Sequence, residues 1–149
     1  MGRCFGVETN DKRLKSVGKT KCYVSTLKSK DRCKYIDDYE ITEKYSFWKV
    51  ITPEAAFKAF SGFGEKFIGT PEEIHTGSYI SFRVNTEEEA KSLLSYLETK
   101  FANYMLSVRK ISQHINEDVC KWIPLVPFDR IWTDDKVCVA LNIEKTMFM

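Results

Sequence analysis

The chain has 149 residues and a net charge of +2, with 43% hydrophobic and 30% charged residues, a balance typical of one globular domain with a single core. No segment approaches the ~18 uncharged apolar residues of a membrane span, and the first residues lack the apolar middle of a secretory signal, so we expect a cytoplasmic protein without a membrane partner. Five scattered cysteines without a C-x-x-C pair, with only His75 and His114 beside them, argue against a disulfide framework and a structural zinc site.

Positive charge is concentrated in the first quarter of the chain. Residues 1–34 hold ten lysines and arginines against three carboxylates. Because neutralisation of phosphates with release of counterions drives nucleic-acid binding, such a segment favours a polyanionic partner. The alternative is a solvated loop whose charge is balanced by acidic residues elsewhere in the fold. The cations that we expect to contact DNA phosphates are Lys12, Arg13, Lys15, Lys19 and Lys21.

Short β-branched, aromatic or alternating runs predict strands. They cover residues 21–26, 33–36, 46–51 and 79–84. Pro53 is expected to close the third strand. Residues 52–77 contain two prolines and four glycines and predict a long surface loop, of the kind that often carries function. Gly62, Gly64 and Lys66 of this loop are candidate DNA contacts.

A helix signal follows the last of these strands. Thr86 stands three residues before Glu89, the spacing of a capping box, and the acidic run 87–89 suits the positive start of a helix. Apolar residues then recur at spacings of three and four from Ala90 to Ile115. The pattern predicts one long amphipathic helix, or two helices with a small bend.

The chain then leaves the helix through an extended stretch with two prolines, residues 121–128, and Thr133 or Asp134 is expected to cap a last short helix. Together these elements predict an α+β fold, in which a mixed β-sheet of short strands packs on one long amphipathic helix and a long loop contains glycine and proline. No repeat or linker divides the sequence, so residues 1–149 are expected to form one domain.

The end of the predicted helix gathers side chains that bond phosphates and base edges. They are Arg109, Lys110, Gln113 and His114. Arginine pairs with guanine and glutamine with adenine. A helix C-terminus carrying cations that favour its dipole explains the same residues equally well. Only the basic front segment shifts the interpretation toward DNA.

The sequence offers little support for catalysis. Residues 60–64 have a superficial likeness to the glycine turn by which methyltransferases hold S-adenosylmethionine, but no hydrophobic strand precedes them and no helix pattern follows. No Asp-Pro-Pro-Tyr motif for adenine methylation occurs. Pairs such as Glu65-Lys66 and Asp135-Lys136 lack the one-residue spacer of metal-dependent nucleases, and nothing beyond their presence supports a nucleophilic pair of Cys120 with His114. We therefore expect no catalytic and no metal-binding residues.

Short signatures also occur in order along the chain. They are Phe5-Gly6 with Thr9, Lys49-Val50-Ile51 with Pro53, Gly62-Phe63-Gly64-Glu65, residues 86–101, Leu106, Arg109-Lys110-Ile111 with Gln113-His114, Ile123-Pro124, and Trp132-Thr133-Asp134. In this order they resemble the C-terminal target-recognition region of adenine-specific DNA methyltransferases from bacterial restriction–modification systems. The resemblance spans nearly the whole chain.

The resemblance implies a domain that grips double-stranded DNA and reads its bases without chemistry of its own. In that family a separate catalytic domain binds S-adenosylmethionine and methylates a flipped adenine. That half is absent from this sequence, so the resemblance implies no cofactor in this chain and a methyltransferase catalytic domain as partner, in cis or in trans. The chain is then a fragment, a split gene product or a stand-alone specificity protein.

In the mechanism that we expect, cations of residues 10–34 position the duplex through its phosphates, and the 53–77 loop and the helix end near Arg109 and Gln113 supply base contacts. This mechanism requires the basic front segment and the cationic helix end to converge on one groove. The competing expectations are a module that binds only protein, and a small metal-dependent nuclease or other hydrolase.

Overall fold

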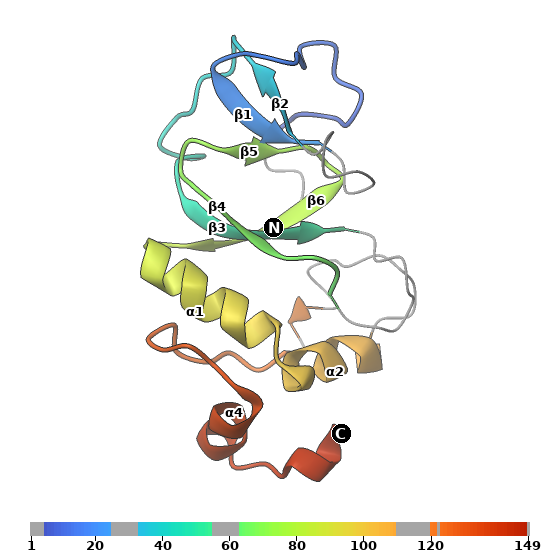
Figure 1. Ribbon diagram of the computed structural model, residues 1–149, viewed down its shortest axis with the longest axis vertical. Helices are drawn as coiled ribbons and strands as arrows, with labels where there is room; N and C mark the ends of the chain where they lie inside the picture. The colour runs from blue at the N-terminus through green and yellow to red at the C-terminus, as the bar shows by residue number, and fades with distance from the viewer. Residues whose placement is uncertain (1–4, 25–32, 55–62, 110–119, 122, 149) are drawn as a thin grey trace.

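A computed structural model, which describes residues 5–24, 33–54, 63–109, 120–121 and 123–148, gives the chain an α+β fold (Figure 1). The predicted fold class is therefore confirmed. The strands are β1 Thr20–Tyr23, β2 Cys33–Ile36, β3 Trp48–Pro53, β4 Phe67–Gly69, β5 Ile74–His75 and β6 Tyr79–Val84. The helices are α1 Glu87–Leu97, α2 Lys100–Arg109 and α4 Asp134–Leu141, and the short 3-10 helix η2 covers Lys145–Met147.

The described strands form two small sheets, so the prediction of a single mixed sheet is wrong. Sheet A has the order β2-β1-β5, in which β1 pairs antiparallel with β2 and parallel with β5. Sheet B has the order β4-β3-β6 and is antiparallel throughout. Alternation along a strand predicts which side chains share a face, but it does not predict which strand lies alongside. The sequence pattern therefore did not separate the two sheets.

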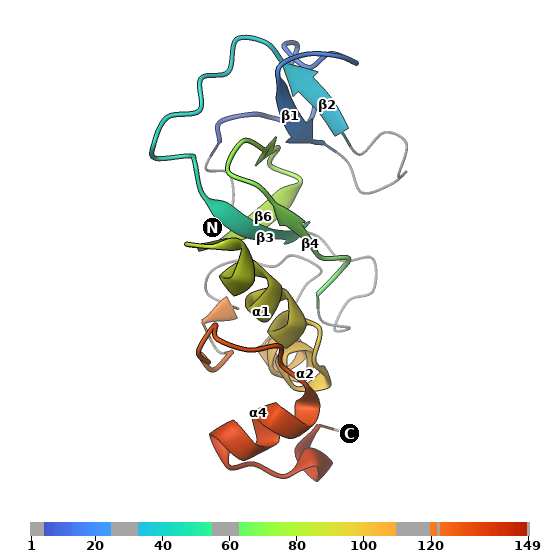
Figure 2. The same ribbon diagram turned by 60° about the vertical axis from the view of Figure 1, so that its left-hand side comes forward.

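Sheet B lies between sheet A and the helices, and its two faces have different neighbours (Figures 1 and 2). On one face Val50 belongs to a core cluster that includes Leu93 of α1. On the other face Ile51 and Tyr79 pack with Tyr23 of sheet A. Because successive side chains of a strand point to opposite faces, β3 contributes to both contacts.

The predicted loop over residues 52–77 is only partly a loop. Its described part includes the end of β3 and the whole of β4 and β5. Pro53 is the last residue of β3, as expected, and is paired with Tyr79 of β6. The ladder between β3 and β4 reaches only to Ile51, so the missing N–H of proline removes no ladder bond on that side. Residues 55–62, including the candidate Gly62, lie outside the described residues.

The predicted long helix is divided into α1 and α2, as the two-helix form of the prediction allows. The Thr86 hydroxyl caps α1 as expected. At the break, the Asp134 carboxylate accepts the N–H groups of Lys100 and Phe101 at 3.2 and 3.0 Å. The Thr99 hydroxyl accepts the N–H three residues further on at 3.1 Å. These acceptors satisfy the first N–H groups of α2, so a second helix begins where one continuous helix was the simpler prediction.

Candidate nucleic-acid interface

Two of the predicted phosphate contacts, Arg13 and Lys15, bind carboxylates of their own chain. Arg13 donates from Nε and Nη2 to Asp11 at 3.1 and 2.9 Å. Lys15 Nζ lies 3.0 Å from Asp37 Oδ2. The hydrogen bonds from Arg13 and Lys15 lower the pKa of the respective carboxyl groups below their ordinary values, so both pairs are ionised at pH 7. Exposed pairs of this kind gain little net free energy, and a DNA phosphate can compete with the carboxylate for the cation.

Lys21, unlike Arg13 and Lys15, contacts both a carboxylate and an aromatic ring. Its Nζ lies 3.4 Å from Glu73 Oε2 and 5.1 Å from the centroid of the Tyr23 ring. The Tyr23 hydroxyl donates to the same carboxylate at 3.0 Å, and Thr70 N–H donates to its other oxygen at 2.9 Å. Burial works to raise the pKa of Glu73, but these hydrogen bonds and the lysine charge outweigh it and lower the pKa. Glu73 therefore remains a carboxylate and neutralises Lys21.

Lys12 and Lys19 differ from these three cations. Both side chains are exposed, and neither forms an ion pair with another residue of the described part of the chain. The alternative interpretation, in which acidic residues of the fold balance the basic segment, thus holds for three of the five predicted contacts. Lys12 and Lys19 are thus the two of the five that form no ion pair among the described residues, although the charge of Lys19 contributes to the lowered pKa of Asp37.

The described residues of the predicted contact loop have packing roles. A Cβ on Gly64 would lie 3.3 Å from Pro53 Cγ, so glycine allows the chain to approach β3 closely. Lys66 is half-buried, and its Nζ donates to Gly64 O at 3.2 Å and lies 5.9 Å from the centroid of the Phe63 ring. Burial lowers the pKa of Lys66. Contact of either residue with DNA stays a prediction.

The described part of α2, up to the backbone of Arg109, does not meet the basic front segment. Lys110, Gln113 and His114 lie outside the described residues, and only the backbone of Arg109 is described. In both views α2 lies on the opposite side of sheet B from β1 and β2 (Figures 1 and 2). The expected groove between the front segment and the helix end is therefore not formed by the described residues, because sheet B lies between them.

The front segment instead meets the turn between β5 and β6, residues 76–78. The backbone contacts of this turn to other segments are Gly77 N–H to Val7 O (3.1 Å), Thr76 N–H to Tyr23 O (2.9 Å), and Glu54 N–H to Ser78 O (3.0 Å). The 76–78 turn thereby joins the N-terminal segment, the end of β1 and the end of β3. Three segments that are distant in the sequence come together at one place.

Three hydroxyl groups gather at the 76–78 turn. Thr9 Oγ1 lies 2.5 Å from Ser78 Oγ and 3.4 Å from Thr76 Oγ1. Thr76 is fully buried and donates to Val24 O at 3.4 Å, whereas Thr9 is exposed and Ser78 is half-buried. The sequence analysis names Thr9 in the signature with Phe5-Gly6, but it does not predict the turn at residues 76–78. The available signal was the Thr-Gly-Ser run directly before a predicted strand.

A buried polar joint lies next to this turn and links the two sheets. His75 of β5 is 1% exposed; its Nδ1 lies 2.8 Å from Thr76 O, and its Nε2 lies 2.9 Å from Ser81 Oγ of β6. Because a carbonyl only accepts, Nδ1 carries the hydrogen and Nε2 accepts from the serine. Burial lowers the pKa of His75 to about 4, and the Lys49 ammonium adds to this effect. His75 is therefore neutral at pH 7 and fixes the position of Thr76.

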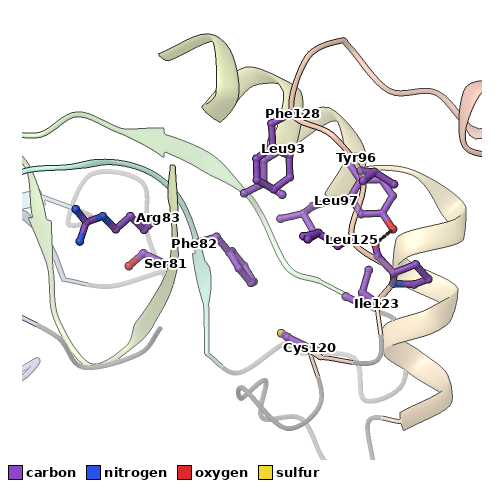
Figure 3. A pocket seen from close by; sticks show the side chains of 12 residues that line it. Ser81, Phe82, Arg83, Leu93, Tyr96, Leu97, Cys120, Ile123, Leu125 and Phe128 are labelled. Atoms are coloured by element: carbon purple, nitrogen blue, oxygen red, sulfur yellow. Dashed lines mark hydrogen bonds between the residues drawn. The ribbon is translucent and has the colours of Figure 1, made fainter. Parts of the chain in front are cut away.

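An apolar pocket of about 370 Å³ lies elsewhere, between β6, α1, Cys120 and residues 123–128 (Figure 3). Phe82 points into it, whereas the side chains of Ser81 and Arg83 point away (Figure 3). The rest of the wall is mostly apolar and includes Leu93, Leu97, Ile123, Val126 and Phe128. No charged side chain of this lining points into the pocket, so the pocket offers no cation to a DNA phosphate and is not part of the candidate interface.

Metal-dependent cleavage needs a group of ligands that the described residues do not supply. Acidic residues two positions before a lysine do occur, at Glu89 and Lys91, Glu98 and Lys100, and Asp134 and Lys136. They lie on or beside helices, where residues two apart do not share a face. Among the described residues, no three His, Cys, Asp or Glu side chains gather closely enough to hold a metal ion.

The helices of the described ranges all lack the combination of length and apolar character that crossing a bilayer requires. Comparison of the chain with protein-family models, with curated proteins and with solved structures gives no match.

Proposed function

We propose that this chain is a DNA target-recognition domain, which binds double-stranded DNA in a sequence-specific way and performs no catalysis by itself. The observation that carries the proposal is the 76–78 turn, because it holds the N-terminal segment and the ends of β1 and β3 together. Loops that read the bases of one duplex have to leave a rigid scaffold close to one another. The resemblance to the specificity region of adenine methyltransferases supports the same proposal.

The chain that continues from this junction is basic. Val24 and Glu54 are the last described residues before the ranges 25–32 and 55–62. In the sequence, the first range contains three cations and one carboxylate, and the second contains one cation and no carboxylate. The cations that we propose as phosphate contacts are Lys12, Lys19, Lys28, Lys30, Arg32 and Lys58.

The salt dependence of duplex binding tests this proposal. A labelled duplex of mixed sequence is titrated at several salt concentrations, and removal of one cation that binds a phosphate should reduce the slope of log K against log salt by ~0.9. The variant K12A/K19A should therefore lower the slope by about 1.8. The matched control K91A/K100A, with both cations on the helices, should keep the wild-type slope. Absence of duplex binding by the wild type at low salt would contradict the function, and an unchanged slope in K12A/K19A would contradict the assignment of these residues.

The opposite end of the molecule suits a protein partner better than DNA. Val139 of α4 and Ile131 are exposed apolar residues, while Arg130 and Lys145 near them are paired with carboxylates. Exposed apolar surface with compensated charge favours protein contact. We assign this end to a cytoplasmic methyltransferase catalytic domain that binds S-adenosylmethionine, in cis or in trans.

The flanking reading frame should encode the cofactor turn and the adenine-methylation motif of that catalytic domain. The variant V139K should weaken association with the catalytic domain while leaving duplex binding unchanged.

A further inference from the structure

We propose that the hydroxyl groups of Thr9 and Ser78 bind one phosphate group of the DNA backbone, an inference that rests on the proposed function. The two oxygens are 2.5 Å apart although the residues are 69 positions apart in the sequence. Thr9 is exposed and Ser78 is half-buried, so the pair faces solvent, while Thr76 is buried behind it. The location of the pair, at the junction of three segments, is the point where the proposed contact loops leave the scaffold.

The hydrogen-bonding capacity of the cluster leaves a donor for an outside acceptor. Each hydroxyl has one hydrogen. Thr76 directs its hydrogen to Val24 O, and either Thr9 or Ser78 donates to the other. If Thr9 donates to Ser78, the Ser78 hydrogen is left over. If Ser78 donates to Thr9, the Thr9 hydrogen has Thr76 Oγ1 at 3.4 Å, a long contact that a phosphate oxygen, the stronger acceptor, would replace. Ser and Thr hydroxyls are regular contacts of DNA phosphates.

The surroundings of the pair carry charges of both signs, and Arg13 is itself paired with Asp11. Arg13 of the same N-terminal segment has Nη2 3.5 Å from Gly6 O, so its guanidinium lies against that segment. Glu8, next to Thr9, is exposed, and its carbonyl accepts Asp11 N–H at 3.0 Å, so residues 8–11 form a turn.

The site is held in place before any ligand binds. Gly77, between the two outer residues of the turn, is buried and donates its N–H to Val7 O. His75 holds the carbonyl of Thr76 from the other side. A phosphate therefore meets the Ser78 hydroxyl on a turn that is already held in place, with the Thr9 hydroxyl bonded to it, and little conformational entropy is lost on binding.

The double variant T9A/S78A tests the site with the labelled mixed-sequence duplex. Loss of a hydrogen bond to a charged group should weaken binding about tenfold. The salt slope should stay at the wild-type value, because a hydroxyl carries no charge and releases no counterion. The conservative variant T9S/S78T keeps both hydroxyls and should bind like the wild type. The matched control T146A, on η2 at the far end, should also bind like the wild type.

A second arm uses inorganic phosphate, followed through the amide NMR signals of Thr9, Gly77 and Ser78 in the wild type, and needs no variant to fold. Tenfold weaker duplex binding by T9A/S78A, with phosphate-dependent shifts of these signals, supports the site. Equal duplex binding by T9A/S78A and the wild type overturns the site and leaves the proposed function standing. If the wild type binds no duplex but phosphate shifts these signals, the function fails and the site is one for free phosphate. If neither ligand acts, both proposals fail.

Discussion

Protonation of His75 should make the fold sensitive to mild acid. The ordinary pKa of 6.5 describes the unfolded chain, whereas burial in the joint between the sheets lowers the pKa of His75 to about 4. Between these two pH values the unfolded chain binds a proton at His75 that the folded chain does not bind. The contribution of neutral His75 to the unfolding free energy is therefore fully present above pH 6.5 and is lost as the pH falls toward 4. From about pH 7.5 to about pH 5 the wild type should lose about 2 kcal/mol of unfolding free energy through this one group.

Urea unfolding at a series of pH values measures this loss. H75Q cannot take up a proton, so its unfolding free energy should change by about 2 kcal/mol less than that of the wild type over the same interval. H114Q measures the contribution of the other histidine and should retain most of the wild-type pH dependence. The interval stops near pH 5 because Asp11, Asp37 and Glu73, whose pKa values are lowered, lose their stabilising charge at lower pH. A pH dependence in H75Q equal to that of the wild type would refute the reasoning.

Three further predictions concern the contacts of single residues. A Cβ at position 69 would lie 2.6 Å from Ile51 Cδ1, so Gly69→Val should reduce the unfolding free energy by ~2 kcal/mol or more, and wild-type stability in urea would contradict the packing argument. Asp134→Ala removes the acceptor at the start of α2 and should reduce stability by ~1 kcal/mol, measured in the same way; an unchanged midpoint would mean that the break in the helix does not depend on it. Glu73→Gln removes the carboxylate that neutralises Lys21, so duplex binding should tighten and its salt slope should steepen by up to ~0.9. Weaker binding by this variant would show that Lys21 does not reach the DNA.

Local signals in the sequence predicted local structure well. The strands at residues 33–36 and 79–84 have the predicted bounds, and Thr86 and Thr133 cap helices as expected. In each case the information lies within a few residues, in the alternation of side chains or in a side chain that bonds a nearby N–H group.

Features that depend on distant residues could not be read in the same way. The two helices separate where Asp134, more than thirty positions further along the chain, reaches the start of α2. The charge on Lys21 is balanced by Glu73 of another segment, and the contact between Thr9 and Ser78 joins the N-terminal segment to the turn between β5 and β6. Composition shows that these groups exist, but only the tertiary fold brings them together. The sequence therefore shows the cations of the basic front segment, but it does not show which carboxylates pair with them.

The pairing of β1 with β5 leads to an expectation about the order in which the molecule folds. Cys22 lies beside Ile74 in a parallel ladder, so this pairing closes a long loop, whereas β3, β4, β6 and α1 follow one another closely in the chain. Closing long loops is entropically unfavourable and slows folding. Sheet B with its helix should therefore form early, and the N-terminal segment should dock last. In a destabilised variant this end should open first, so limited proteolysis would remove the N-terminal segment and sheet A while the helical end remains intact.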